Sequence, residues 1–173
     1  MKRTILIFLL LVATLHTSAQ ISTSMHYTVS LDTIGKYLNV QLDYTATRPS
    51  DDILFKMPVW APGYYMILNY PKHLCDFTAT DSQGTALRWK KQGKNGWLVS
   101  MPADGKAIIK YRIFSDERDV ASNRIDSHTA FIAPNGVFMY VDEEKYRPVS
   151  VTYEVPTNWK SVSMVGIAPR VTS

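Results

Sequence analysis

The chain has 173 residues, of which 46% are hydrophobic, and its formal net charge is +4 at neutral pH. This length is enough for a single hydrophobic core. Cys75 is its one cysteine, which excludes an intramolecular disulfide and a metal site built from several cysteines. The densest basic run, residues 88–94, is broken by Trp89 and Gly93. Because nucleic-acid binding needs a sustained basic face, we expect no nucleic-acid partner.

The first 19 residues have the order of regions found in a secretory signal peptide. Two basic residues open the chain, an uncharged apolar run follows from Ile5 to Leu15, and three small residues stand at 17–19. The apolar run is shorter than the roughly 20 residues that span a bilayer. We therefore expect residues 1–19 to be cleaved, the product to be periplasmic or secreted, and no membrane span to remain. Cleavage removes two basic residues and no acid, so the net charge falls from +4 to +2, with 17 basic residues against 15 acidic ones.

From Met25 onward, apolar and polar residues alternate with a period of two, which indicates β-strands. Turn residues recur about every 8–12 positions, as they do in sandwiches and barrels. The pattern predicts an all-β fold, a single antiparallel β-sandwich formed within residues 20–173. The strands are expected at residues 25–33, 37–47, 53–59, 74–81, 85–91, 96–101, 105–116, 136–141 and 148–155.

Residues 158–173 begin like a further strand, with no later segment to pair with its edge. An unpaired edge strand promotes aggregation. Two interpretations stay open: the chain is a fragment truncated at the C-terminal edge of this domain, or it is a stand-alone product.

The segment from Met57 to His73, MPVWAPGYYMILNYPKH, is aromatic and almost uncharged. Pro62 presets φ near −65° and Gly63 accepts a positive φ, so the pair predicts a type II turn. The chain is expected to leave a strand at Val59 and to present its tyrosines on an irregular loop. Aromatic residues on such a loop either close one end of the core or form a contact surface.

This segment resembles the PVW-x-PG-x-Y-x-I signature in the N-terminal domain of the glycyl aminopeptidase family of zinc metallopeptidases. The likeness continues, in the same order, through residues 76–99 and 128–141. The family usually has an Arg-Asp or Arg-Glu pair where this chain has Leu68 and Asn69. The resemblance implies a non-catalytic β-domain that packs in cis on a thermolysin-like peptidase domain and helps shape the cleft for a peptide substrate. In the parent family the cofactor is zinc.

No signal for catalysis is visible in the chain itself. A peptidase of the parent type needs His-Glu-x-x-His on a helix, so that two imidazoles bind zinc while the glutamate activates water. None of the four histidines has a second histidine four residues away, and no G-x-S-x-G elbow or glycine-rich phosphate loop is present. We therefore expect no metal ligands, no catalytic residues and no cofactor in this chain.

A second candidate region is the long polar segment from Ser115 to Pro134. Its residues Asp126, His128 and Phe131 resemble a stretch of the same family. In one interpretation, local hydrogen bonds fix this loop and Phe131 enters the core. In the other, this loop and the aromatic segment form one surface facing a peptidase domain. The candidate interface or substrate-cleft residues are Trp60, Pro62, Gly63, Tyr64, Tyr65, Tyr70, Asp126, His128 and Phe131.

A different class of function also fits the sequence. The chain is then a stand-alone extracytoplasmic module that binds peptide or glycan on surface aromatic residues. The two hypotheses are distinguished by the coding region downstream: continuation in frame to His-Glu-x-x-His favours the peptidase module. The aromatic residues available for stacking are Trp60, Tyr64, Tyr65, Trp89 and Trp97.

Overall fold

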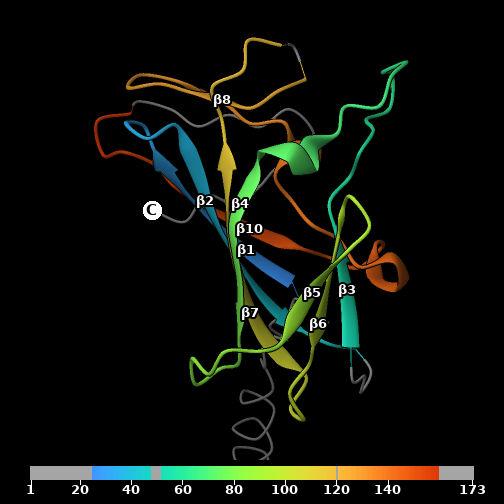
Figure 1. The fold of residues 1–173 in the computed structure, drawn as a ribbon. Helices are drawn as coiled ribbons and strands as arrows, with labels where there is room; N and C mark the ends of the chain where they lie inside the picture. Colours follow the sequence, from blue (N-terminus) through green and yellow to red (C-terminus); the bar gives the residue numbers. More distant parts are fainter. Residues whose placement is uncertain (1–24, 48–51, 120, 160–173) are drawn as a thin grey trace, which may run out of the picture.

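The computed structural model describes residues 25–47, 52–119 and 121–159 (Figure 1). Strands and short 3-10 helices make up its regular structure, which confirms the predicted all-β class. The proposed signal peptide and the chain from residue 160 onward lie outside the described residues. Among the described residues, none of the helices has the length and apolar character needed to cross a bilayer.

The larger sheet has five strands in the order β10-β1-β2-β7-β4. The pairs β1–β2, β2–β7 and β4–β7 are antiparallel, as the sequence predicts. The pair β1–β10 is parallel, with His26 opposite Ser150, so the sheet is mixed. The five strands are β1 (Met25–Asp32), β2 (Tyr37–Thr45), β4 (Leu74–Thr80), β7 (Lys106–Phe114) and β10 (Ser150–Glu154).

A three-stranded antiparallel sheet in the order β3-β6-β5 forms the second layer, and a small ribbon of β8 and β9 lies at one end (Figure 1). Three single-turn 3-10 helices connect these strands. Their bounds are β3 (Asp52–Lys56), β5 (Trp89–Gln92), β6 (Gly96–Ser100), β8 (Arg124–Ile125), β9 (Ala130–Phe131), η1 (Tyr70–His73), η2 (Pro134–Gly136) and η3 (Asp142–Glu144).

The two larger sheets share one hydrophobic core. Every second residue is buried along β2 and β7 and along β1 from Met25 to Val29, which is the expected pattern for strands with one covered face. Tyr44 of β2 and Phe55 of β3 meet edge to face, with ring centroids 5.0 Å apart, so these side chains join the layers. Buried aromatic and β-branched residues of both sheets thus hold the sandwich together.

Residues 136–141 were predicted to form a strand, and this prediction is wrong. The segment begins at the last residue of η2, Gly136, and makes one isolated bridge, between Tyr140 and Lys56. Its buried side chains alternate like those of a strand, but the carbonyls of Val137 and Met139 accept hydrogen bonds from the hydroxyls of Tyr111 and Tyr27. Tyrosine hydroxyls from the five-stranded sheet therefore replace the neighbouring strand that would otherwise satisfy these carbonyls.

Candidate functional site

An arm of irregular chain, residues 59–68, projects from the end of β3 (Figure 1). The strand ends at Lys56, three residues earlier than predicted. Beyond it the Met57 amide still donates to the carbonyl of Asn95 at 2.9 Å, and the side-chain amide of Asn95 donates to the carbonyl of Met57 at 2.9 Å. The arm is closed at its base by a 2.9 Å hydrogen bond from the Leu68 amide to the Val59 carbonyl. We call residues 59–68 the aromatic arm.

The predicted type II turn lies at the beginning of the aromatic arm and is confirmed. Gly63 has a φ of 86°, and the amide of Tyr64 donates to the carbonyl of Ala61 at 3.1 Å. The indole Nε1 of Trp60 donates to the carbonyl of Tyr64. Both contacts are local in sequence, so the shape of the turn is set by the arm itself.

Large apolar side chains on the aromatic arm are exposed to solvent. Tyr65 is fully exposed, and the exposed fractions of Met66, Ile67 and Trp60 are 64%, 74% and 50%. Four such residues fall within eight positions of the chain, a denser grouping than the scattered exposed apolar residues that are normal on proteins. The arm therefore presents these side chains to solvent and does not plug the core.

Tyr70, a predicted interface residue, lies instead in the core, where it is 4% exposed. It opens η1 and packs against Gly136 of η2, where a Cβ on Gly136 would lie 2.9 Å from the Tyr70 ring. Asn69, at φ 47°, turns the chain inward just before it. Tyr70 thus anchors the arm to the sandwich, and the prediction that it forms part of the contact surface is wrong.

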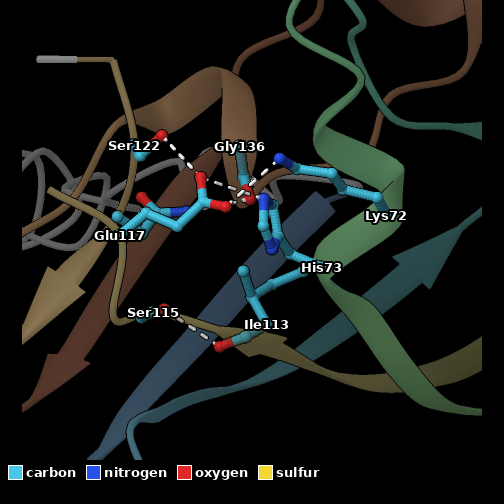
Figure 2. Close-up of polar contacts among 8 residues, drawn as sticks. Lys72, His73, Ile113, Ser115, Glu117, Ser122 and Gly136 are labelled. Carbon is cyan, nitrogen blue, oxygen red and sulfur yellow. Dashed lines mark hydrogen bonds and ion pairs between the residues drawn. The ribbon is translucent and has the colours of Figure 1, made fainter. Parts of the chain in front are cut away.

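A polar network joins η1 to the segment that follows β7 (Figure 2). Lys72 Nζ and His73 Nε2 lie 3.1 and 3.2 Å from the two carboxylate oxygens of Glu117, and Ser122 Oγ donates to the same carboxylate at 3.0 Å. Burial raises the pKa of Glu117, but hydrogen bonds from Lys72 and Ser122 outweigh it and hold the pKa below its usual value. Glu117 is therefore ionised at neutral pH and holds the two segments together.

Two further contacts fix the loop after β7 against the arm and η2. The hydroxyl of Tyr64 donates to Asp119 at 3.0 Å. The buried amide side chain of Asn123 donates to the carbonyl of Gly136 at 3.1 Å and accepts from the amide of Ala133 at 2.8 Å. The aromatic arm, η1 and residues 115–119 and 121–123 thus form one connected end of the domain.

Asp126 and His128 belong to a separate, self-contained turn. Asp126 accepts hydrogen bonds from the amides of His128 and Thr129, both at 2.8 Å, and these bonds lower the pKa of Asp126 to about 2. His128 is exposed. Phe131 is 54% exposed, so the expectation that it enters the core is wrong, while local hydrogen bonds do fix the turn as predicted.

The structure therefore divides the predicted candidates into two groups. Trp60, Pro62, Gly63, Tyr64 and Tyr65 lie together on the aromatic arm, whereas the Asp126 turn makes no recorded polar contact with it. Among the aromatic residues suggested for ligand stacking, Trp97 is only 4% exposed and belongs to the core. Sequence reasoning missed several residues that position the arm or extend its apolar surface, namely Met66, Ile67, Lys72, His73, Glu117 and Asn123.

Only some of these missed residues carried a sequence signal. Met66 and Ile67 are apolar residues inside the aromatic segment, so their exposure would have followed from treating that whole segment as a surface. Glu117 and Asn123 lie in an unremarkable polar loop, and their partners are distant in sequence. Within the described parts of the chain, no three His, Cys, Asp or Glu residues are grouped as metal ligands.

His73 makes this end of the domain sensitive to acid. Burial lowers the pKa of His73 from its usual 6.5, the charge of Lys72 lowers it further, and Glu117 offsets only part of this, so the ring is neutral at pH 7. Below about pH 6.5 His73 is protonated in the unfolded chain more readily than in the folded chain. The free energy of unfolding therefore falls as the pH drops from about 6.5 to the lower pKa of the folded state. We expect His73→Gln to reduce the loss of melting temperature between about pH 7.5 and 5.5.

The matched control for this pH dependence is His128→Gln, since His128 is exposed. This control should retain the wild-type pH profile. A wild-type profile in the His73 variant would show that His73 has no such role. Glu117 has a lowered pKa and contributes a further loss only below its unfolded pKa of about 4.5.

The fold and this site define an all-β module that presents exposed apolar side chains on an arm. Residues 26–166 match the family model described as the Peptidase M61 N-terminal domain. The chain belongs to this family, in agreement with the resemblance to zinc aminopeptidases seen in the sequence. A search of curated proteins found no match.

A solved structure with a TM-score of 0.70 shows the same kind of fold. An aminopeptidase N family protein from Idiomarina loihiensis is similar with a TM-score of 0.70 and 22% identity, over 77% of this chain and 22% of that one. An M1 zinc metallopeptidase from Deinococcus radiodurans is similar with a TM-score of 0.45 and 13% identity, over 76% of this chain and 31% of that one. This chain therefore spans less than a third of either structure.

Proposed function

We propose that this chain is the non-catalytic N-terminal domain of an exported zinc aminopeptidase. Its role is to dock on the peptidase domain through the aromatic arm and to help shape the cleft that receives a peptide. The exposed apolar surface of the arm carries this proposal, together with membership of the M61 N-terminal domain family. The N-terminal pattern of the sequence supports export.

The composition of the arm suits a protein interface. Aromatic residues and methionine are enriched at interfaces, and the arm presents Trp60, Tyr65 and Met66 to solvent. Burying this surface against an apolar partner releases ordered water and favours association. On the isolated domain the same side chains contact mainly water.

The network beneath the arm lowers the cost of docking. Tyr70 in the core, the Glu117 carboxylate and the Tyr64–Asp119 hydrogen bond hold the arm in place before a partner arrives. A surface that is ordered in advance loses less conformational entropy on binding. In the parent enzyme, zinc and its ligands belong to the peptidase domain, and this chain contributes position and shape.

The proposal is tested first by an aminopeptidase assay on the purified chain, with and without added zinc. We expect no turnover above the buffer blank in either condition, because hydrolysis needs a group that activates water and this chain lacks the His-Glu-x-x-His motif. Zinc-dependent turnover that co-purifies with the chain through successive columns would overturn the non-catalytic role. The reading frame in the native gene supplies the second test, since it should encode that motif downstream.

A further inference from the structure

A cavity of about 530 Å³ opens between the edge strands of the two sheets, beside η1. Its walls come from β4 in the five-stranded sheet and from β5 and β6 in the three-stranded sheet, which diverge toward η1 (Figure 1). This volume lies within the range of small-molecule sites, about 300–1,000 Å³. The cavity is distinct from the exposed face of the aromatic arm, so the inference below does not rest on the proposed function.

Aromatic rings form the apolar part of the cavity. Phe77 and Trp97 are stacked, with ring centroids 5.6 Å apart, and Trp89 meets Phe77 edge to face at 4.8 Å. Phe77 and Trp97 are buried, while Trp89 remains 43% exposed. Trp89 therefore presents apolar surface to the cavity that the protein itself does not cover.

The charged residues of the cavity are mainly positive. Lys72, Lys91 and Lys94 line it together with a single acid, Asp76. Lys72 is paired with Glu117, and Asp76 with Arg112 at 3.3 Å. Among the described residues, neither Lys91 nor Lys94 has a recorded carboxylate partner. Two ammonium groups are thus left at the rim to attract an anion.

Lys91 is held by an aromatic ring in place of a carboxylate. Its Nζ lies 3.0 Å from the centroid of the Trp97 ring. Burial lowers the pKa of Lys91 to about 8, so the group still carries its charge at pH 7. A cation–π contact is weaker than a charge-assisted hydrogen bond to a carboxylate, and a bound anion would therefore gain Lys91 as a partner.

We propose that this cavity binds a small ligand that combines an apolar, preferably aromatic, group with one carboxylate. The apolar group packs against the exposed surface of Trp89, beside the buried Phe77–Trp97 pair, and the carboxylate lies between Lys91 and Lys94. A positively charged amine would be repelled by the excess positive charge of the cavity, and a neutral ligand would leave the lysines without an anionic partner. The C-terminus of a peptide ending in an aromatic residue and a free aryl carboxylate share this chemistry.

The test uses the purified protein and measures tryptophan fluorescence during titration with 3-phenylpropionate. We expect saturable binding with a dissociation constant of about 1 mM or below, an affinity within reach of a ligand of this size. The amide 3-phenylpropionamide should bind about tenfold more weakly, because the charge-assisted bonds are lost. Comparing N-acetyl-Gly-Phe with 3-phenylpropionate separates the two sources. Tighter binding of N-acetyl-Gly-Phe identifies a peptide C-terminus as the preferred ligand, and tighter binding of 3-phenylpropionate identifies a free acid.

Matched variants locate the site. Lys91→Met and Lys94→Met should each weaken binding of 3-phenylpropionate by about tenfold. Lys90→Met removes the same charge from the same strand but lies outside the cavity lining, and it should leave binding unchanged. Saturating ligand should also slow alkylation of Cys75, which lines the cavity and is the only cysteine in the chain.

Three results would overturn the assignment. The first is equal affinity for the acid and the amide, and the second is equal weakening of binding by Lys90→Met and Lys91→Met. The third is no saturable binding up to about 20 mM ligand, a concentration far above the dissociation constant expected for this site. A circular dichroism melt of each variant verifies that it is folded. If Lys91→Met fails to fold, Lys94→Met carries the same test.

Discussion

Replacing Tyr70 with alanine is expected to lower the free energy of unfolding by about 3–5 kcal/mol, the usual cost of removing a large buried aromatic ring. Tyr70 is 4% exposed and fills the space against Gly136 of η2. Its loss leaves a cavity between η1 and η2, beneath the aromatic arm. The measurement is the midpoint of urea unfolding, with an unchanged m-value indicating that the denatured state is unaffected.

Tyr70→Phe is the matched control for this prediction. The hydroxyl of Tyr70 makes no recorded hydrogen bond within the described residues, so its removal should change stability by less than about 1 kcal/mol. If Tyr70→Ala proves as stable as Tyr70→Phe, Tyr70 is not a core residue and the anchoring of the arm has been misassigned. The substitution also tests the central correction to the sequence interpretation, which placed Tyr70 on a contact surface.

Replacing Tyr65 with serine is expected to weaken docking on the peptidase domain by about 2 kcal/mol, or roughly thirtyfold, as at interface residues that dominate binding. Tyr65 is fully exposed and lies beside Met66 and Ile67 on the aromatic arm. Because the Tyr65 side chain is fully exposed, the melting temperature of the isolated chain should not change. The measurement is the affinity for the purified peptidase domain of the parent enzyme, determined by titration calorimetry.

Tyr146→Ser is the matched control for docking. Tyr146 is 94% exposed and follows η3, so the same chemical change is made on an exposed tyrosine away from the aromatic arm. This control should bind with wild-type affinity. Equal weakening by both substitutions, or wild-type binding by Tyr65→Ser, would exclude the arm as the docking surface.

The substitutions Tyr65→Ser and Tyr70→Ala distinguish the roles of two aromatic residues that are close in the sequence. Tyr65 and Tyr70 are five positions apart in the same uncharged segment, yet one is fully exposed and the other is buried. The buried residue holds the arm on the sandwich, and the exposed one is available to a partner. A partner surface is most effective when its support is rigid, which explains why the anchor and the contact residues occur in one short stretch.

The fold class follows from local sequence. Period-two alternation marks strands, because successive side chains of a strand point to opposite faces. The turn at Pro62 and Gly63 is equally local. Proline fixes its own φ, and glycine tolerates the positive φ that the following position of the turn requires. The sequence also carried the family resemblance, through the aromatic segment and the two stretches that follow it.

The tertiary structure decided which alternating or aromatic residues are covered. Alternation shows that residues share a face, but it does not show what packs on that face. Residues 136–141 alternate like a strand, yet Tyr27 and Tyr111 satisfy two of their carbonyls from the neighbouring sheet. Strand β10 pairs in parallel with β1, which no local pattern indicates.

The sequence by itself thus determined an all-β fold, the sharp turn of the arm and the absence of an intramolecular disulfide. Only the tertiary structure placed Tyr70 against Gly136, joined Glu117 to His73, and left Phe131 and the arm exposed. The physical reason is the range of the forces involved. Backbone sterics act between adjacent residues, whereas burial and hydrogen bonding of loop side chains depend on segments that meet only after the chain has folded.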